Sequence, residues 1–147
     1  MVSVKPYLVP SKPQGRTVPE VPGTAARWCV INRSRGRVLL PDVLLADTLW
    51  KRVRGLLGTR ATGRGQSCWL TGCSSVHALG MRYALDLFFL DLDGRIIFKQ
   101  IGLRPWRFSA WILRATQVLE VESGWLHTDQ APVGDILVIQ SIDGNLP

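Results

Sequence analysis

The apolar residues of this chain fall mostly into short runs separated by turn residues, a pattern typical of β-strands. The most apolar run, Leu85–Leu92, is followed by Asp93-Gly94 and then by a second run, Ile96–Ile101. An Asp-Gly pair between two such runs predicts a tight hairpin, because the turn requires positive φ at its central residues. Further strands are predicted at 29–32, 38–40, 43–46, 69–70, 75–77, 118–121 and 136–139.

One stretch follows a helical period instead. Leu49, Val53, Leu56 and Leu57 recur at positions i, i+4, i+7 and i+8, so they would form a single apolar stripe on a helix. We therefore predict an amphipathic helix over about 48–57, and a turn or a second short helix around 124–130.

These elements predict a mainly β fold, either a compact sandwich or a jelly-roll-like barrel. Residues 1–26 hold five prolines and have almost no apolar periodicity, so we expect a disordered Pro-rich tail. Residues 27–147 are then one globular β-rich domain, because a chain of 147 residues is of ordinary size for a single domain.

The net charge of +7 is distributed unevenly. Residues 27–64 carry nine basic and two acidic side chains, whereas residues 65–147 carry six basic and eight acidic ones. The basic region 27–64 would attract an anionic partner, although a solvated face explains the same charges. Because no nucleic-acid-binding motif is present, we expect no specific nucleic-acid binding.

Two observations bear on location. No apolar run approaches the roughly 18 residues that a spanning helix needs, and the N-terminus has no apolar signal segment, so we expect no membrane partner. Three cysteines are an odd number, which excludes a complete disulfide framework and favours a cytoplasmic setting.

The densest group of reactive residue types lies at 73–82. Cys73, His77 and Met81 have a spacing that resembles the ligand loop of small blue-copper proteins, but the second imidazole such a site needs could come only from His127, which follows the loop. A buried Cys and Met beside a hydrogen-bonded His is the simpler interpretation. We expect no metal and no cofactor.

Asp86 is the most informative single residue. It shares one face of its predicted strand with apolar residues, and a buried carboxylate needs a partner. Arg82 and His77 are the nearest candidates in sequence. With a serine at 74 or 75, His77 and Asp86 supply the residue types of a nucleophile relay, although no Gly-x-Ser-x-Gly elbow accompanies them. The structural alternative is an ion pair, or a carboxylate that accepts hydrogen bonds from loop amides.

A second stretch, Arg104-Pro105-Trp106-Arg107-Phe108 with Trp111 following, contains residue types enriched at protein interfaces. The alternative is a loop folded over the sheet edge, with its Trp side chains covering the core.

Together, several short motifs resemble a known family. They are Arg54-Gly55-Leu56-Leu57-Gly58, Cys73-Ser-Ser-Val-His77, Gly80-Met81-Arg82, Leu85–Asp91, Gly94-Arg95, Val118-Leu119-Glu120 and Gly134-Asp135. In this order they are similar to the bacterial and archaeal domain of unknown function 192, over about residues 27–140. The resemblance implies a compact, mainly β fold and no established activity, substrate or cofactor. Its signature positions are Arg54, Gly55, His77, Met81, Arg82, Asp86 and Asp135, while 78–79 and 83–84 depart from the family pattern.

The sequence thus favours a small non-catalytic binding or accessory domain, for a small ligand or an anionic partner, with a cleft formed by the 73–86 segment and the 104–111 loop. The site residues we predict are Arg54, His77, Met81, Arg82, Asp86, Arg104 and Trp106. One alternative is an enzyme of unknown reaction that uses His77 and Asp86. Another is an adaptor that binds an anionic partner through the basic 27–64 region.

Overall fold

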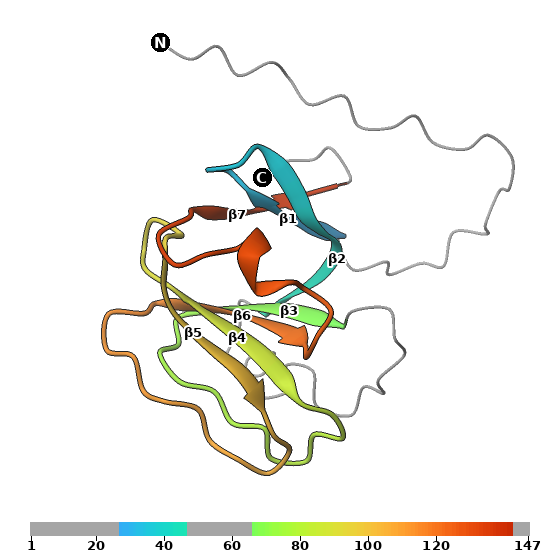
Figure 1. The fold of residues 1–147 in the computed structure, drawn as a ribbon, viewed down its shortest axis with the longest axis vertical. Coiled ribbons are helices and arrows are strands. Elements are labelled where there is room, and N and C mark those ends of the chain that lie inside the picture. The colour runs from blue at the N-terminus through green and yellow to red at the C-terminus, as the bar shows by residue number, and fades with distance from the viewer. Residues whose placement is uncertain (1–26, 47–65, 143–147) are drawn as a thin grey trace, which may run out of the picture.

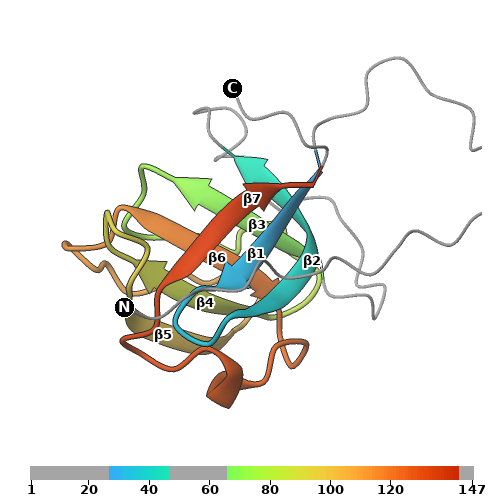
Figure 2. The same cartoon turned by 90° about the horizontal axis from the view of Figure 1, so that it is seen from above.

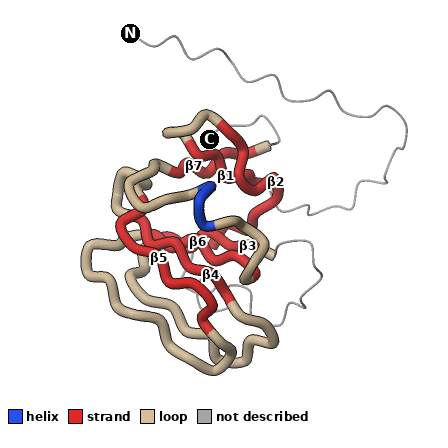
Figure 3. The backbone as a smooth tube through the Cα atoms, in the orientation of Figure 1, coloured by secondary structure: helices blue, strands red, loops and turns tan. Residues whose placement is uncertain are grey.

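The structure is a computed structural model that describes residues 27–46 and 66–142. The predicted tail, the predicted helix at 48–57 and Arg54 lie outside this range. The described elements are seven strands and one 3-10 turn (Figures 1 and 3). They are β1 (Trp28–Asn32), β2 (Arg37–Ala46), β3 (Ser67–Thr71), β4 (Leu85–Leu90), β5 (Ile96–Leu103), β6 (Gln117–Glu122), η1 (Thr128–Gln130) and β7 (Leu137–Ser141). The fold is mainly β, as predicted, and η1 lies where a turn or short helix was expected.

The seven strands form one mixed sheet in the order β5-β4-β6-β3-β2-β1-β7. All neighbours are antiparallel except β2 and β3, which are parallel. The sheet curls, so that β7, β1 and β2 lie across β3, β6 and β4 (Figure 2). It does not close into a barrel, and that part of the sequence prediction is wrong. Its two edge strands, β5 and β7, form no ladder with each other and meet only at their first residues, through the bridge between Arg95 and Ile136 and backbone hydrogen bonds between residues 94–96 and 134–137.

Strand β2 explains how one sheet forms two layers. Its first part pairs with β1, where Leu40 faces Val30, and its last three residues pair with β3, where Leu44 faces Cys68. Pro41 cannot donate a ladder hydrogen bond and is tolerated because it lies at an irregularity of the β1–β2 ladder, between Leu40 and Val43. The sequence pattern suggested two separate strands at 38–40 and 43–46, and the structure joins them into one.

Strand β4 is buried along its whole length because both of its faces are covered. The inner cluster lies between the two layers and includes Val30, Leu40, Phe88, Leu90, Leu119 and Leu137. The outer cluster lies on the opposite face and includes Val76, Met81, Leu85, Leu87, Phe89 and Leu103. Alternate β4 residues thus enter different clusters, as the two-residue period of a strand requires.

The predicted hairpin between β4 and β5 is present, with one difference in its turn. Only Gly94 has positive φ, and Asp93 does not. A side chain at Gly94 would overlap the carbonyl oxygen of Leu137, since the Leu137 amide donates to Gly94 at 2.8 Å. Glycine is therefore required here for close approach as well as for backbone conformation.

No helix within the described ranges is long and apolar enough to cross a membrane.

Candidate functional site

The structure brings the 73–86 segment and the 104–111 loop together by direct backbone pairing. Ala78 donates to the Arg107 carbonyl at 2.8 Å, and Trp106 donates to the Ala78 carbonyl at 2.7 Å. Ser109 donates to Val76 at 2.8 Å through its backbone amide, while its hydroxyl accepts from the Val76 amide at the same distance. The two paired segments, residues 74–81 and 104–112, form a two-stranded ribbon that lies outside the main sheet. Below, residues 104–114 are called the aromatic loop.

The ribbon covers the outer face of the sheet with small and aliphatic side chains. Val76, Ala78 and Met81 are buried in the outer cluster, and Ile112 packs against it. The two tryptophans of the aromatic loop do not cover the core, because both are exposed. The loop is therefore anchored by one set of residues and presents another set to solvent.

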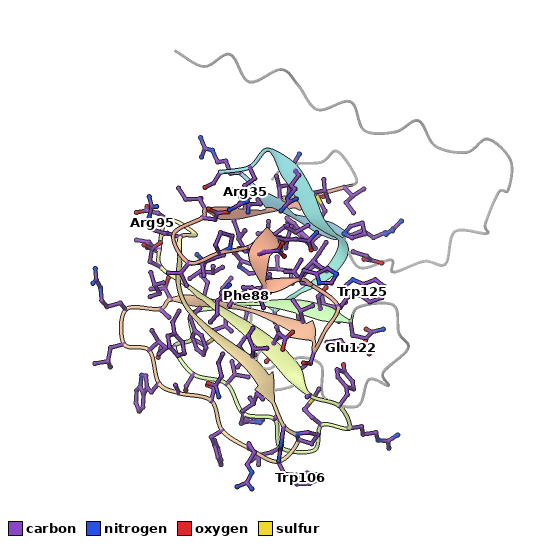
Figure 4. The ribbon with its side chains drawn as sticks, in the orientation of Figure 1. Arg35, Phe88, Arg95, Trp106, Glu122 and Trp125 are labelled. Atoms are coloured by element: carbon purple, nitrogen blue, oxygen red, sulfur yellow. The ribbon has the colours of Figure 1, made fainter. Side chains whose placement is uncertain are left out.

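The side chains that the aromatic loop exposes to solvent include an unusual number of large apolar ones. Four large side chains in eight residues are more than two-thirds exposed: Trp106 (68%), Phe108 (70%), Trp111 (71%) and Leu113 (84%). In Figure 4, Trp106 points away from the ribbon at the end of the molecule opposite Arg35. Single exposed apolar residues are ordinary, but several in succession indicate an interaction surface.

The backbone at Trp106 supports this interpretation. Its φ of 65° is the only positive value among the non-glycine residues that the structure describes. A bulky side chain rarely adopts this conformation, and strained residues of this kind concentrate at functional sites. The hydrogen bond from Trp106 to Ala78 holds the residue in place, although its indole is exposed.

The charge of this region has one sign. The stretches 72–85 and 94–119 contain all six basic residues of the chain's last 83 residues and no acidic residue. Two of the six bind carbonyls elsewhere, since Arg95 donates to Gly134 and Lys99 donates to Thr128. The other four are exposed and form no ion pair with any described carboxylate: Arg82, Arg104, Arg107 and Arg114.

His77 belongs to the ribbon. It is exposed and forms the β-bridge to Phe108. The two rings meet edge to face, with their centroids 6.5 Å apart. No hydrogen bond joins His77 to Asp86, both of which are described.

Asp86 is buried, with 2% of its surface exposed, and its partners are not those nearest in sequence. Its Oδ1 accepts from the Gly102 amide at 2.8 Å and from the Ser123 hydroxyl at 2.9 Å, while its Oδ2 accepts from the Gly124 amide at 3.0 Å. Asp86 lies at an irregularity in the β4–β5 register, which lets it reach β5 and the turn after β6 together. This is the loop-amide alternative rather than an ion pair with Arg82.

The residues that were predicted to form one site therefore lie in different parts of the structure. Met81 packs with Leu85 and Leu87 in the outer cluster, whereas Asp86 alternates to the other face of β4. His77, Arg104 and Trp106 are exposed on or beside the ribbon, as is Arg82. The stretch 94–119 contains no acidic residue. This was the sequence signal that could have identified Phe108 and Leu113 as exposed residues of the same surface as Trp106.

Asp135, the last signature position, ties the β1–β2 turn to the segment before β7. Its Oδ2 accepts from Asn32 Nδ2 at 2.8 Å and from Arg35 Nε at 2.6 Å. The Asn32 hydrogen bond, followed by the hydrogen bond and charge of Arg35, lowers the pKa of this carboxyl below its ordinary value of 3.8. The role of this network is structural.

The cysteines show no arrangement for catalysis or metal binding. Burial, and secondarily the nearby Glu120 and Cys73, raise the pKa of the Cys68 thiol far above its ordinary value, so it stays protonated. A protonated thiol is a poor nucleophile and a poor ligand. In the parts of the chain that the structure describes, no three His, Cys, Asp or Glu side chains form a group that could hold a metal ion.

Comparison with known proteins gives a consistent result. Residues 30–139 match the family DUF192, described as an uncharacterized ACR. A UPF0127 protein of Thermococcus sibiricus is 30% identical over 110 residues, which cover 72% of this chain and 71% of that protein. A second UPF0127 protein, from Pyrococcus furiosus, is 28% identical over 113 residues, or 74% and 95% of the two chains.

Two solved structures have a similar fold. A protein of unknown function from Novosphingobium aromaticivorans has a TM-score of 0.58 at 20% identity, covering 76% of this chain and 83% of its own. A "putative transcription regulator" from Sinorhizobium meliloti 1021 has a TM-score of 0.61 at 24% identity, covering 79% and 92%. At these identities the likeness concerns the fold alone.

Proposed function

The chain belongs to the uncharacterized family DUF192, and within that family we propose that it is a non-catalytic binding domain whose partner contacts the aromatic loop. The observation that carries this proposal is the contrast within the ribbon. Its backbone is hydrogen-bonded and its inner side chains are buried, yet Trp106, Phe108 and Trp111 project into solvent. Aromatic side chains held on an ordered backbone are the usual anchors of binding surfaces.

Four arginines that form no ion pair with a described carboxylate give this surface a preference for anionic partners. Arg104, Arg107 and Arg114 lie in the loop and Arg82 lies in the adjoining segment, without a carboxylate between them. An anionic partner would be attracted at long range and then held by apolar contact. Anionic preference, which the sequence assigned to the basic 27–64 region, is here extended to the aromatic loop. We keep the cytoplasmic setting in the proposal, supported by three free cysteines.

An enzyme that uses His77 and Asp86 is less well supported. Both oxygens of Asp86 are occupied by Gly102, Ser123 and Gly124, and the carboxylate is buried away from solvent. An acid or base must reach the proton that it transfers.

Site-specific photocrosslinking in the expressing cell tests the proposal. A benzophenone amino acid is placed at Trp111 in one variant and at Leu92 in another. Leu92 is the matched control, because it is 81% exposed in the β4–β5 turn, outside the aromatic loop. We expect a discrete adduct from position 111 and none from position 92. Equal adducts from both positions, or none from either, would refute a partner at the loop.

A further inference from the structure

We infer that the partner of the aromatic loop is the surface of an anionic phospholipid membrane, on which the loop lies with its apolar side chains in the interface. This inference rests on the proposed function and names its partner. The sequence led us to expect no membrane partner because it lacks a spanning segment. A loop that enters only the headgroup region needs no such segment.

The first argument is the composition of the exposed set. Trp106, Phe108 and Trp111 are accompanied in the same loop by an exposed aliphatic residue, Leu113. Aromatic rings alone would suit the bases of a single-stranded nucleic acid, on which they stack. Leu113 has no π face, yet it is the most exposed of the set. Lipid accepts aromatic and aliphatic side chains alike, with Trp favoured at the level of the headgroups.

The second argument is charge. The exposed apolar side chains of the aromatic loop alternate in sequence with arginines and with no acidic residue, which is the composition of segments that lie on anionic membranes. The same charges oppose a second copy of this chain as the partner. A two-fold contact through the aromatic loop would bring its three arginines against three identical ones.

The third argument is conformational. The strained backbone at Trp106 is held by the hydrogen bond to Ala78, so the loop keeps its apolar side chains outward in the free protein. A partner must have room for these projecting apolar side chains. A fluid bilayer provides such space without a preformed complementary shape.

Cosedimentation of the full chain with vesicles tests the inference. The vesicles contain phosphatidylcholine alone or phosphatidylcholine with phosphatidylglycerol. We expect binding to the anionic vesicles only, weakened by salt, with a blue shift of tryptophan fluorescence. Leu113→Ser should lower the partition coefficient about tenfold or more. Arg107→Gln should lower it about fivefold.

Two matched variants control for composition and for the basic region near the N-terminus. Leu92→Ser removes an equally exposed leucine, and Arg33→Gln removes an exposed charge from the β1–β2 turn. Neither should lower the binding by more than about twofold, since both lie outside the aromatic loop. An effect of Arg33→Gln as large as that of Arg107→Gln would overturn the inference, because the basic region would then face the vesicle.

The outcomes also separate this inference from the proposed function. Absence of binding to anionic vesicles at low salt overturns the lipid inference. If a polyglutamate peptide or an oligothymidylate is then bound, and Leu113→Ser or Arg107→Gln weakens that binding, the aromatic loop is a binding surface for another class of partner. If no probe binds through the loop and position 111 gives no crosslink, both proposals fail.

Discussion

At the residue scale, Asp86 connects three parts of the fold. Its carboxylate joins the irregular end of β5, through Gly102, to the turn after β6, through Ser123 and Gly124. These partners are neutral, so no hydrogen-bond partner among the described residues neutralises the charge. Hydrogen bonds from backbone amides and a hydroxyl stabilise the buried carboxylate instead.

Asp86→Ala should therefore destabilise the protein strongly. Hydrogen bonds to a charged group contribute about 1.5–3 kcal/mol each and do not add fully, so we expect a loss of about 3 kcal/mol in unfolding free energy. Urea denaturation measures it. Asp93→Ala, which removes an exposed carboxylate from the β4–β5 turn, is the control and should change little. A loss for Asp86→Ala as small as that of the control would contradict the assigned role.

Substitutions at Trp106 test its backbone conformation, because glycine should there be more stabilising than alanine, the reverse of their usual order. At φ 65°, glycine avoids the strain that any side chain causes, so Trp106→Gly should be more stable than Trp106→Ala by about 1 kcal/mol. At Phe108, in the β-bridge to His77, the order should be reversed, because glycine is disfavoured in extended structure. Thermal or urea denaturation of the four variants decides the matter. Alanine equal to or better than glycine at 106 would show that the left-handed conformation is absent in solution.

At the element scale, the sheet is held at one corner by a polar network. Asn32 and Arg35, at the β1–β2 turn, both donate to Asp135, and Asn32 also donates to the Gln130 carbonyl at 3.0 Å. Since Asn32 pairs with Leu137 at the ends of β1 and β7, this network fixes the β1–β2 turn to η1 and to the segment that leads into β7.

The network predicts a pH dependence of stability. Folding lowers the pKa of Asp135, so its carboxylate stabilises the native state above the ordinary value of 3.8, and that contribution disappears as the pH falls through the lower folded value. Asp135→Asn should be less stable than the natural protein at neutral pH, and the difference should shrink in acid. Denaturation series across pH measure it, with Asp129→Asn as an exposed control. A difference that stays constant down to low pH would mean that the charge is not involved.

The strands could be predicted from sequence more readily than their partners. The apolar run of β4 and the turn at Gly94 are local signals, and both were found where expected. The continuity of β2 through Pro41 depends on two different neighbours, which no local pattern reveals. Pairing order is likewise non-local, so the curled but open sheet could not be distinguished from a barrel.

The candidate site was predictable in part for the same reason. The composition of the 104–111 stretch identified Trp106 and Arg104 as candidates for a surface. Asp86 was expected to be buried, but its partners are 16 to 38 residues away, whereas Arg82 and His77 are only a few residues away. Whether the tryptophans cover the core or face solvent depends on which side chains fill the outer cluster. That space is taken by Val76, Ala78 and Met81.

At the scale of the whole molecule, two regions have different tasks. The curled sheet and its two clusters supply the stability, and the ribbon on the outer face carries the aromatic loop. This division is ordinary for binding proteins, in which a rigid scaffold positions a loop that makes the contacts. It requires the loop to be ordered before it meets a partner, because ordering on binding would weaken affinity.

Hydrogen exchange of the free, full-length protein tests that requirement most directly. If the ribbon is formed in solution, the amides of Ala78, Trp106 and Ser109 exchange slowly, since each donates a backbone hydrogen bond across it. The amide of Arg107, which donates no such bond in the structure, is the internal comparison and should exchange faster. The account predicts protection of the first three at neutral pH without any ligand. Exchange of all four at the rate of an unstructured peptide would contradict it, because the exposed aromatic side chains would then lie on a disordered loop rather than on a built surface.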